Sequence, residues 1–358
     1  MRAAGRPAAF ETIHPAGAAR NPLPVNLHDR NALPADAGWW GYSMYDVPER
    51  ESGETFIATI PDATLVSYVD EQREFLPAIL TCDGKAMNLR EIVFRNRHAE
   101  VLRERPRPRR IKRATWICER VYDNHSHWLT AHLPKLCLLR ERDMLSDVLL
   151  PTRLSPAMEA SLRLMGLDPA AFARFEPGEL LQVEEFTFLS TDRFRPELLR
   201  PVREAIAPLG SAAEPHRKIY ISRGKARMRR LVNEDDIWPV FERAGFERVF
   251  MEEMDFPAQV RLMSQTAMLA APHGAGLTNM MFCPPGAQVV EIAWLGFPNP
   301  NFYALASAMG LGYALVPAEP FGDATPLQRD MVADVEAVQA ALDAAERNIQ
   351  PSPLSAGG

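Results

Sequence analysis

The chain has 358 residues, of which 47% are hydrophobic and 24% charged, and its 40 basic and 46 acidic side chains give a formal net charge of −6. This length and composition suit a globular protein of two domains, and the acidic balance argues against a dedicated nucleic-acid binder, whose domain is usually basic. Four widely spaced cysteines without a Cys-X-X-Cys motif predict neither a disulfide framework nor a zinc site.

The first 24 residues contain no apolar run of signal-peptide length, and no uncharged stretch is long enough to span a bilayer. We therefore expect a soluble, cytoplasmic protein that is at most peripheral to a membrane. Residues 1–50 are rich in Pro, Ala and Gly without sustained periodicity, and we expect them to be irregular. Short strands are predicted at Phe56–Ile60 and Thr64–Val69, opening an α/β domain over residues 51–210.

A basic segment, Arg103–Arg113, carries seven basic side chains among eleven residues. Such runs are usually solvated, and we interpret this one as a proline-stiffened loop. The alternative is a patch that contacts anionic lipid or a polyprenyl pyrophosphate, which would place the protein at the inner face of a membrane.

A predicted helix begins at Asn124 and ends before Pro134. Asn124, His127 and Ala131 are spaced three and four residues apart, so they share one face of this helix. Three histidines fall within eight residues, but their spacing is not that of a recognised metal-ligand set. A histidine near the start of a helix is well placed for proton transfer or substrate contact, and a merely hydrogen-bonded histidine is the alternative.

The first domain continues with alternating strands and helices, including a helix expected at Pro196–Ile206. The segment Pro208–Pro215 is typical of a linker, and we place the domain boundary there. We expect a second domain over residues 211–322, a C-terminal helix over residues 323–349 and a disordered tail over residues 350–358.

The second domain is more regular, with five strand candidates that alternate with helix candidates. The strands are expected at Lys218–Ser222, Glu247–Met251, Ala267–Ala271, Gln288–Ala293 and Tyr313–Val316. This alternation predicts a doubly wound parallel sheet, in which ligands bind beyond the carboxyl ends of the strands. The loops after the first and third of these strands lie at that edge.

The loop after the third strand reads Pro-His-Gly-Ala-Gly-Leu-Thr-Asn at positions 272–279. We expect Gly274 and Gly276 to allow positive φ, so that a bulky anion can lie against the backbone. The helix expected next would direct unpaired N–H groups and its positive dipole end at the same spot, and Thr278 and Asn279 add polar side chains. This is a candidate phosphate site, and a plain strand–helix turn is the alternative.

The loop after the first strand, Arg223–Arg230, has five basic residues among eight. A cationic loop and a glycine-lined loop at one sheet edge suit a diphosphate. Asn233 is expected to cap the following helix. Glu291 lies on the fourth strand at the same edge, where a carboxylate could accept the two hydroxyls of a ribose or form an ion pair.

Two sets of residues occur in an order that is more specific than any single motif. In the first half, Asn124-His125-Ser126-His127-Trp128-Leu129 is followed by Leu133-Pro134. The second half has Tyr220-Ile221-Ser222-Arg223, Ala226, Arg229, Asn233-Glu234, Gln259, Ala267, His273-Gly274-Ala275-Gly276-Leu277-Thr278-Asn279, Pro285-Gly286 and Val290-Glu291. Over roughly residues 55 to 317 the chain resembles glycosyltransferase family 61, which includes bacterial capsule and lipopolysaccharide enzymes, O-linked GlcNAc transferases and plant xylosyltransferases.

The resemblance implies a GT-B fold, with two facing Rossmann-like domains and a C-terminal crossing helix. It also implies an inverting transfer from a nucleotide sugar, usually a UDP-sugar, to a hydroxyl. No metal or other cofactor is implied, because cationic side chains and helix N-termini can stabilise the departing diphosphate. By position, the substrate-binding residues are Asn124, Arg223, Arg229, His273, Gly274, Ala275, Gly276, Leu277, Thr278 and Asn279, with Glu291 assigned to the nucleoside.

The chain departs from the family pattern at the position of a possible base, which an inverting transfer needs to deprotonate the acceptor hydroxyl. Many relatives have an acidic residue four positions after the first-domain histidine, where this chain has Ala131. His127 is therefore the candidate base, with His132 next. The expected acceptor is a surface glycan or lipid-linked saccharide, and no nucleic-acid partner is expected.

Two other functional classes stay open. The departure at Ala131 is compatible with a non-catalytic subunit that binds sugar nucleotides. A dinucleotide-dependent oxidoreductase is the other alternative, although no predicted strand is followed by Gly-X-Gly-X-X-Gly with an acidic residue about twenty positions on.

Overall fold

The computed structural model describes residues 2–3, 6–7, 9–38, 40–104, 107–207 and 215–349. The chain forms two compact units. The first comprises Met1–Gly17 and Ser52–Val202, and the second comprises Ala18–Glu51 and Arg203–Gly358. The expected linker, except for its last residue, and the expected disordered tail lie outside the described residues.

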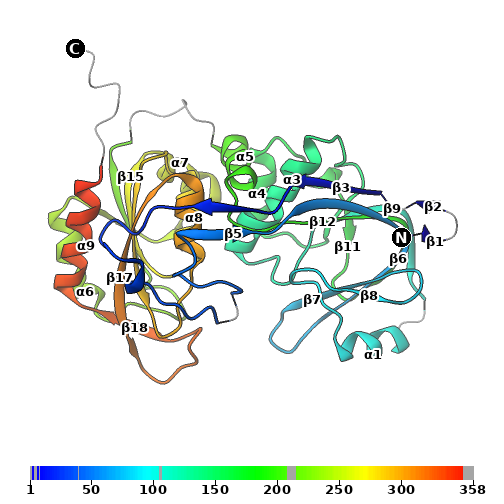
Figure 1. Cartoon of the computed structure of the whole chain (residues 1–358), viewed down its shortest axis with the longest axis horizontal. Helices are drawn as coiled ribbons and strands as arrows, with labels where there is room; N and C mark the ends of the chain where they lie inside the picture. The colour runs from blue at the N-terminus through cyan, green and yellow to red at the C-terminus, as the bar shows by residue number, and fades with distance from the viewer. Residues whose placement is uncertain are drawn as a thin grey trace, which may run out of the picture. The chain divides into compact units, whose positions relative to one another are not determined.

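The first unit is built on an eight-stranded mixed sheet (Figure 1). Four neighbouring strands are parallel, and the sheet continues through antiparallel strands from β12 onward. In sheet order the strands are β11 (Ala173–Phe175), β10 (Val148–Pro151), β9 (Arg109–Trp116), β12 (Leu180–Ser190), β6 (Thr55–Val69), β7 (Phe75–Leu80) and β8 (Ala86–Met87), with β3 (Ala9–His14) also on β6.

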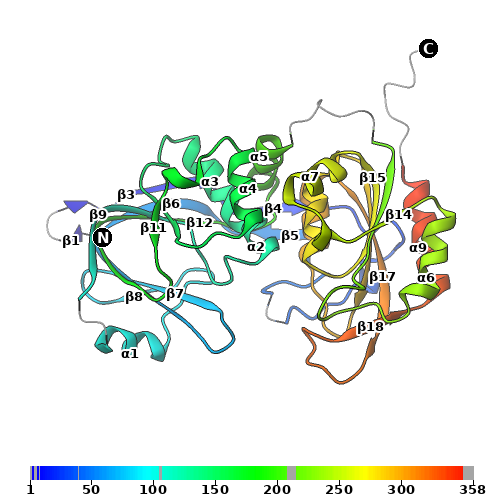
Figure 2. The same ribbon diagram turned by 180° about the vertical axis from the view of Figure 1, so that it is seen from behind.

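Helices cover both faces of this sheet (Figures 1 and 2). α1 lies on one face, where Val101 packs against Val66, Ala78 and Leu180. The other helices lie on the opposite face, and Ser155 caps α4 by accepting from the backbone N–H of Met158. The helices are α1 (Asn96–Glu104), α2 (His125–His127), α3 (Leu133–Arg140), α4 (Pro156–Leu164) and α5 (Pro196–Ile206).

The basic segment Arg103–Arg113 is not a loop throughout, contrary to expectation. Arg103 lies in the last turn of α1, which ends at Glu104, and from Arg109 onward the segment is strand β9. The side chain of Arg109 forms a bidentate ion pair with Glu179, with N–O distances of 2.5 and 2.9 Å. Pairing with β12 orders the strand, because a partner strand supplies backbone bonds that local charge does not predict.

The N-terminal segment is also not irregular as expected. Besides β3, it contains β4 (Gly17–Arg20) and β5 (Glu49–Ser52), which pair with each other, and the short strands β1 (Arg2–Ala3) and β2 (Arg6–Pro7). Residues 18–51 belong to the second unit.

Long-range hydrogen bonds order this part of the chain. The backbone N–H of Val25 donates to the carbonyl oxygen of Tyr313 at 2.7 Å. The side-chain amide of Asn26 bonds both the N–H and the C=O of Leu315, at 3.0 and 2.8 Å. These partners lie far away in the sequence, so local periodicity does not reveal them.

The second unit contains the doubly wound sheet that the sequence predicts. Five strands are parallel, and a sixth strand at the edge is antiparallel. Their order is β14 (Glu247–Val249), β13 (Arg217–Ile221), β15 (Thr266–Pro272), β16 (Gln288–Trp294), β17 (Gly312–Phe321) and β18 (Asp330–Ala333). The central strands read as continuous buried runs, as parallel strands covered on both faces do.

Helices cover the two faces of this sheet (Figures 1 and 2). α6 (Glu234–Arg243) and α9 (Val335–Arg347) lie on one face, and α7 (Phe256–Ser264) and α8 (Asn301–Met309) lie on the other. A 3-10 helix, Ala275–Phe282, connects β15 to β16.

The C-terminal helix is shorter than the predicted range, residues 323–349. Residues Asp330–Ala333 form strand β18, and the helix begins only at Val335, where Asp334 caps it. Its apolar stripe is buried within the second unit, against α6, β16 and β17.

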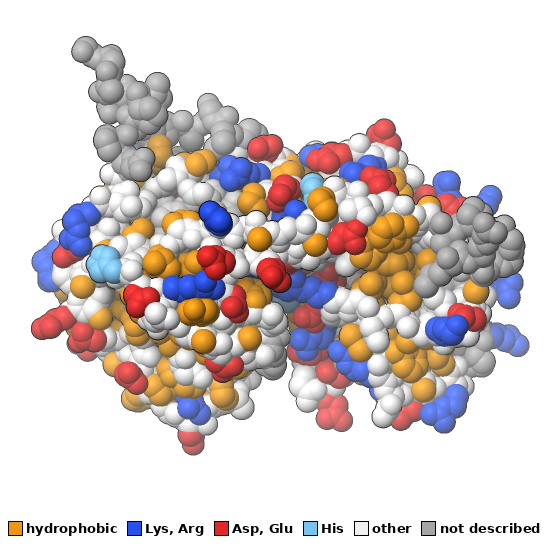
Figure 3. All heavy atoms as spheres, viewed as in Figure 1, with side chains coloured by type: hydrophobic (Ala, Val, Ile, Leu, Met, Phe, Trp, Pro, Cys, Tyr) orange, Lys and Arg blue, Asp and Glu red, His pale blue; other side chains and the backbone are white. Residues whose placement is uncertain are grey.

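The surface is mixed in charge. On the face shown in Figure 3, basic and acidic side chains are interspersed over both units. Within the described ranges no helix is long and apolar enough to cross a membrane. All four cysteines are free, and Cys118, Cys137 and Cys283 are buried.

Candidate functional site

The second sheet changes winding direction between β13 and β15. Strand order runs from β13 outward to β14 on one side and through β15, β16 and β17 on the other. Ligands of such sheets bind at the carboxyl ends of the strands beside this switch point. Arg223 lies two residues after β13, and His273 and Gly274 follow β15 directly. The fold therefore brings the two anion-suited loops of the sequence together.

Gly274 is closely packed against a side chain, and its φ of 174° is that of extended backbone rather than the left-handed conformation we expected. A Cβ atom at this position would lie 1.9 Å from Nη1 of Arg223, so the guanidinium rests directly on the glycine backbone. Gly276 also lacks a positive φ, and a Cβ there would meet Ile221 and Met251 at an ordinary 3.5 Å. The two glycines are therefore not equivalent.

The guanidinium of Arg223 is held by its own loop. Its Nε donates to the carbonyl oxygen of Arg229 at 2.9 Å, and Nη2 donates to that of Met228 at 2.7 Å. Glu234 fixes the start of the loop by accepting from Ser222 Oγ at 2.5 Å and from the Arg223 N–H at 3.3 Å. These bonds place a cation at the switch point without neutralising it.

Asn233 does not cap α6 as the sequence suggested. Its side-chain amide instead bonds the backbone C=O and N–H of Ala333, at 2.8 and 3.1 Å. The residue therefore joins the loop before α6 to strand β18.

Two neighbouring arginines are short of negative partners. Burial lowers the pKa of Arg229, and burial together with the charge of Arg229 lowers the pKa of Arg223 to about 10, so both stay cationic at neutral pH. Nε of Arg229 is buried without a hydrogen-bond partner, and the residue has a left-handed φ of 55°. Burying like charges side by side is unfavourable unless an anion joins them, so this arrangement suits a phosphate or diphosphate.

The remainder of the glycine loop is mostly structural. The residues Ala275–Phe282 form a 3-10 helix, so the expected α-helical N-terminus is absent from this loop. Leu277, Thr278 and Asn279 are buried, and the Asn279 amide donates to Gln259 Oε1 at 3.0 Å. These three buried side chains stabilise the loop from the protein interior.

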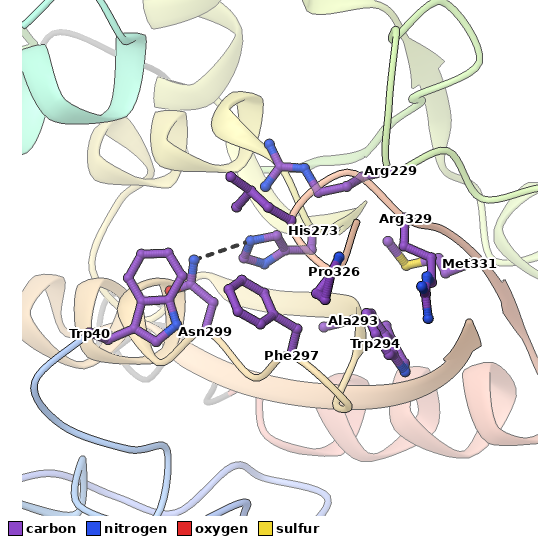
Figure 4. Close-up of a pocket in the computed structure, with 11 residues that line it drawn as sticks. Trp40, Arg229, His273, Ala293, Trp294, Phe297, Asn299, Pro326, Arg329 and Met331 are labelled. Carbon is purple, nitrogen blue, oxygen red and sulfur yellow. Dashed lines mark hydrogen bonds between the residues drawn. The ribbon is translucent and has the colours of Figure 1, made fainter. Parts of the chain in front are cut away.

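A pocket next to the arginines combines cationic, polar and aromatic walls (Figure 4). Trp40 and Phe297 lie with ring centroids 6.0 Å apart, and Arg329 lies over the ring of Trp294 at 5.1 Å. The remaining lining residues are Arg229, His273, Ala293, Asn299, Pro326, Leu327 and Met331. The wall of the pocket therefore combines cationic side chains with the flat apolar rings of Trp40, Trp294 and Phe297.

Glu291 is not available to a ribose, contrary to the interpretation of the sequence. Its side chain is only 1% exposed, and each carboxylate oxygen already has a partner. Nδ1 of His273 lies 2.5 Å from Oε1, and the hydroxyl of Tyr313 donates to Oε2 at 2.5 Å. Burial and Glu291 raise the pKa of Tyr313, which therefore stays protonated as a donor.

Sequence reasoning missed several residues of this site. Trp40, Asn299 and Phe297 carry no motif, and Tyr313 was counted only as part of a strand. Their position beside His273 depends on strand order and on the long-range docking of residues 18–51. Because both are properties of the tertiary structure, no local pattern could have identified them.

In the first unit, the predicted helix at Asn124 extends beyond Pro134. It consists of α2, a π-helical turn at Trp128–His132 and α3. Asn124 is its N-cap, and its side chain accepts from the N–H groups of Ser126 and His127 at 3.0 and 3.3 Å. π-helical turns occur frequently at functional sites because they re-aim side chains within a helix.

His127, the candidate base, has a ring nitrogen, Nδ1, that is buried and without a hydrogen-bond partner. Burial is the largest cause that lowers its pKa well below the usual value, followed by the positive charge of Arg193. The imidazole is therefore neutral at physiological pH and can accept a proton, but its positive surroundings make it a weak base.

His132 has a structural role. Its Nδ1 donates to the carbonyl oxygen of His127 at 2.9 Å, and its Nε2 accepts from the N–H of Glu119 at 3.1 Å. Burial lowers its pKa to about 4. Beneath it, Glu119 and Lys135 form a buried ion pair at 2.5 Å. Both ring nitrogens of His132 are engaged, so the ring holds the π-helical turn in place.

Comparison with known proteins shows which protein family the stretch with the two anion-suited loops resembles. A family model described as Glycosyltransferase 61 matches residues 125–290, from α2 to the strand that carries Glu291. This stretch is a glycosyltransferase family 61 domain. It includes His127, Arg223 and the loop from His273 to Asn279, and it covers just under half of the chain.

Several curated proteins are similar to parts of this chain. A β-1,2-xylosyltransferase of Oryza sativa subsp. japonica is 34% identical over 125 residues, which is 33% of this chain and 21% of the relative. The EGF domain-specific O-linked N-acetylglucosamine transferase of Drosophila melanogaster is 33% identical over 106 residues, 28% of this chain and 20% of the relative. An O-linked-mannose β-1,4-N-acetylglucosaminyltransferase of Takifugu rubripes is 40% identical over 73 residues, 19% of this chain and 12% of the relative.

The matched part of this chain spans only about a fifth of these relatives or less. What they share with it is a glycosyltransferase domain and not a whole protein. Across the described ranges, no group of three or more His, Cys, Asp or Glu side chains could hold a metal ion.

Proposed function

We propose that the protein is a glycosyltransferase that moves a sugar from a nucleotide sugar, in our proposal a UDP-sugar, to a hydroxyl of a glycan or lipid-linked saccharide. The observation that carries this proposal is a pair of partly buried arginines at the switch point of the second sheet, Arg223 against Gly274 and Arg229 in the same loop. Two like charges brought together in this way suit a diphosphate, and they lie within a domain whose named relatives transfer sugars.

In this proposal the second unit holds the donor. Arg223 and Arg229 bind the diphosphate, with Gly274 leaving room for the guanidinium of Arg223. As negative charge develops on the leaving diphosphate, fixed cations stabilise it without having to reorganise. The aromatic walls of the pocket, Trp40 and Phe297, offer stacking surfaces for the nucleoside.

The transfer step uses the first unit's histidine. The acceptor oxygen attacks C1 of the sugar, the bond from C1 to the diphosphate oxygen breaks, and its electron pair leaves with the nucleoside diphosphate. The hydroxyl proton passes to the neutral imidazole of His127, and the configuration at C1 inverts. We place the enzyme in the GT-B class, with a bacterial surface polysaccharide as the acceptor type.

A second candidate is a subunit that binds a sugar nucleotide without catalysis. Ala131 in place of an acidic residue and the positive surroundings of His127 favour it, because both leave the site without a strong base. Both candidates bind a sugar nucleotide, but only the transferase turns it over.

The test begins with a thermal-shift screen of the purified chain against a panel of nucleotide sugars. Any sugar nucleotide that stabilises the protein is then incubated with saccharide acceptors and release of the nucleoside diphosphate is measured. Stabilisation with release supports the transferase, and stabilisation without release or donor hydrolysis supports the binding subunit. If no nucleotide sugar stabilises the protein, the donor site proposed here is wrong.

A further inference from the structure

The imidazole of His273 is fixed in one tautomer by two independent contacts. Glu291 Oε1 lies 2.5 Å from Nδ1, and Tyr313 occupies the other carboxylate oxygen, so Nδ1 must carry a proton that it donates to Glu291. The side chain of Asn299 shows whether the other ring nitrogen, Nε2, carries a proton. Its Oδ1 accepts from the N–H of Asn301 at 3.0 Å, so its NH₂ group faces His273 Nε2 at 3.3 Å.

Nε2 therefore carries a lone pair in the structure, on the side of the ring that lines the pocket (Figure 4). The edge of the ring also contacts Phe302, with centroids 4.9 Å apart. An acceptor atom is unusual at the mouth of an anion site, because a lone pair repels phosphate oxygens. If an anion is to bind here, Nε2 has to become a donor.

The charged groups around the ring explain how that change can occur. Glu291 on β16 places a carboxylate against Nδ1 of the ring, and Tyr313 on β17 donates to the same carboxylate. Arg229 and Arg329 line the same pocket, and Arg223 rests on Gly274 next in the chain. In the absence of an anion these cations oppose a further positive charge, and a diphosphate would remove that opposition.

We propose that His273 takes up a proton at Nε2 when the diphosphate of the donor binds, and that Glu291 and Tyr313 are the positioning residues that make this possible. The proton comes from solvent, the Asn299 contact to Nε2 is given up, and Nε2–H donates to a phosphate oxygen. This inference rests on the proposed donor site and adds that binding there is linked to a proton.

Calorimetry measures this linkage directly. UDP-N-acetylglucosamine and UDP-xylose are suitable probes, because their diphosphate diester has no proton that ionises near neutral pH. Titration in buffers of different ionisation heat gives the number of protons taken up. We expect about one proton for each bound ligand, because the Asn299 contact shows Nε2 without a proton before the ligand binds. Affinity should then fall as the pH rises, since binding takes up a proton.

Two variants test whether His273, held by Glu291, is the group that takes up the proton. Glu291→Gln keeps the shape of the side chain but removes the negative charge, and it should abolish the proton uptake and flatten the pH dependence. His273→Gln should do the same and also weaken binding. The matched control is His216→Gln, an exposed histidine of the same unit, which should keep the wild-type proton count.

The outcomes separate this inference from the function on which it rests. If the wild-type protein binds either UDP-sugar without proton uptake, the inference is wrong and the donor site stands. Uptake that persists in a folded Glu291→Gln variant, checked by its melting temperature, assigns the proton elsewhere and also overturns it. If neither probe binds, the proposed donor site fails and this inference fails with it.

Discussion

The two histidines proposed for proton chemistry differ in the hydrogen-bond partners of their ring nitrogens. His127 in the first unit is enclosed by positive groups, and its Nδ1 is buried without a partner. His273 in the second unit donates to a buried carboxylate, which is itself held by Tyr313. The same side chain thus has a buried nitrogen without a partner in one unit and a carboxylate partner in the other. Neighbouring charges decide which proton chemistry a histidine can perform.

The largest effect expected from this contrast is on turnover. His127→Gln should lower the rate of transfer by about a hundred- to ten-thousand-fold, the usual contribution of a general base. UDP affinity, measured by calorimetry, should stay near that of the wild type because the donor residues are untouched. His125→Gln on the same helix is the matched control. If His127→Gln transfers sugar at the wild-type rate, the first-unit histidine is not the base.

The next effect concerns the pH dependence of stability in the first unit. His132 has a pKa of about 4 in the folded protein, whereas an unfolded histidine titrates near 6.5. The unfolded state therefore binds the proton first. Stability should be complete above about pH 6.5 and should decline by roughly 3 kcal/mol as the pH falls to about 4. Urea unfolding of wild type and His132→Gln over this range measures the difference.

The control for this prediction is His216→Gln, which removes an exposed imidazole and should leave the pH dependence unchanged. An equal slope in wild type and His132→Gln would show that His132 is not held neutral by burial.

Removal of the cation at the switch point should have the third-largest effect. Arg223→Ala should weaken UDP binding by about 1.5–3 kcal/mol, the value of a hydrogen bond to a charged group. Arg227→Ala changes an exposed arginine of the same loop and serves as the control. Equal affinities for the two variants would remove Arg223 from the donor site.

The smallest expected effect distinguishes the two glycines of the loop. Gly274→Ala should displace the guanidinium of Arg223 and weaken UDP binding by about 1–2 kcal/mol, part of the value of that charged contact. Gly276→Ala should have little effect on binding, because its Cβ would have ordinary contacts. Calorimetry on both variants measures the contrast, and a larger loss in Gly276→Ala would contradict it.

The sequence predicted the second unit well because each of its signals is local. Buried apolar runs such as Thr266–Pro272 identify parallel strands. The chemistry of the two anion-suited loops was also local, since five basic residues and two glycines are visible without a structure. Their meeting at one sheet edge followed from the general geometry of doubly wound sheets.

What the sequence could not predict depends on distant partners. Glu291 was interpreted as a ligand of the nucleoside, but strand order places Tyr313 and His273 against its two oxygens. Gly274 was assigned to backbone conformation, whereas the close approach of Arg223 is what requires it. His132 was second choice as a base, and only the fold shows that both of its nitrogens are engaged.

The most direct test of the account is a crystal structure of the chain with UDP bound. We expect the diphosphate to lie against the backbone of Gly274, within hydrogen-bond distance of Arg223 and Arg229, with the uracil near Trp40 and Phe297. UDP bound elsewhere on the second unit, or bound without contact to either arginine, would contradict the central claim that these two partly buried cations form the donor site.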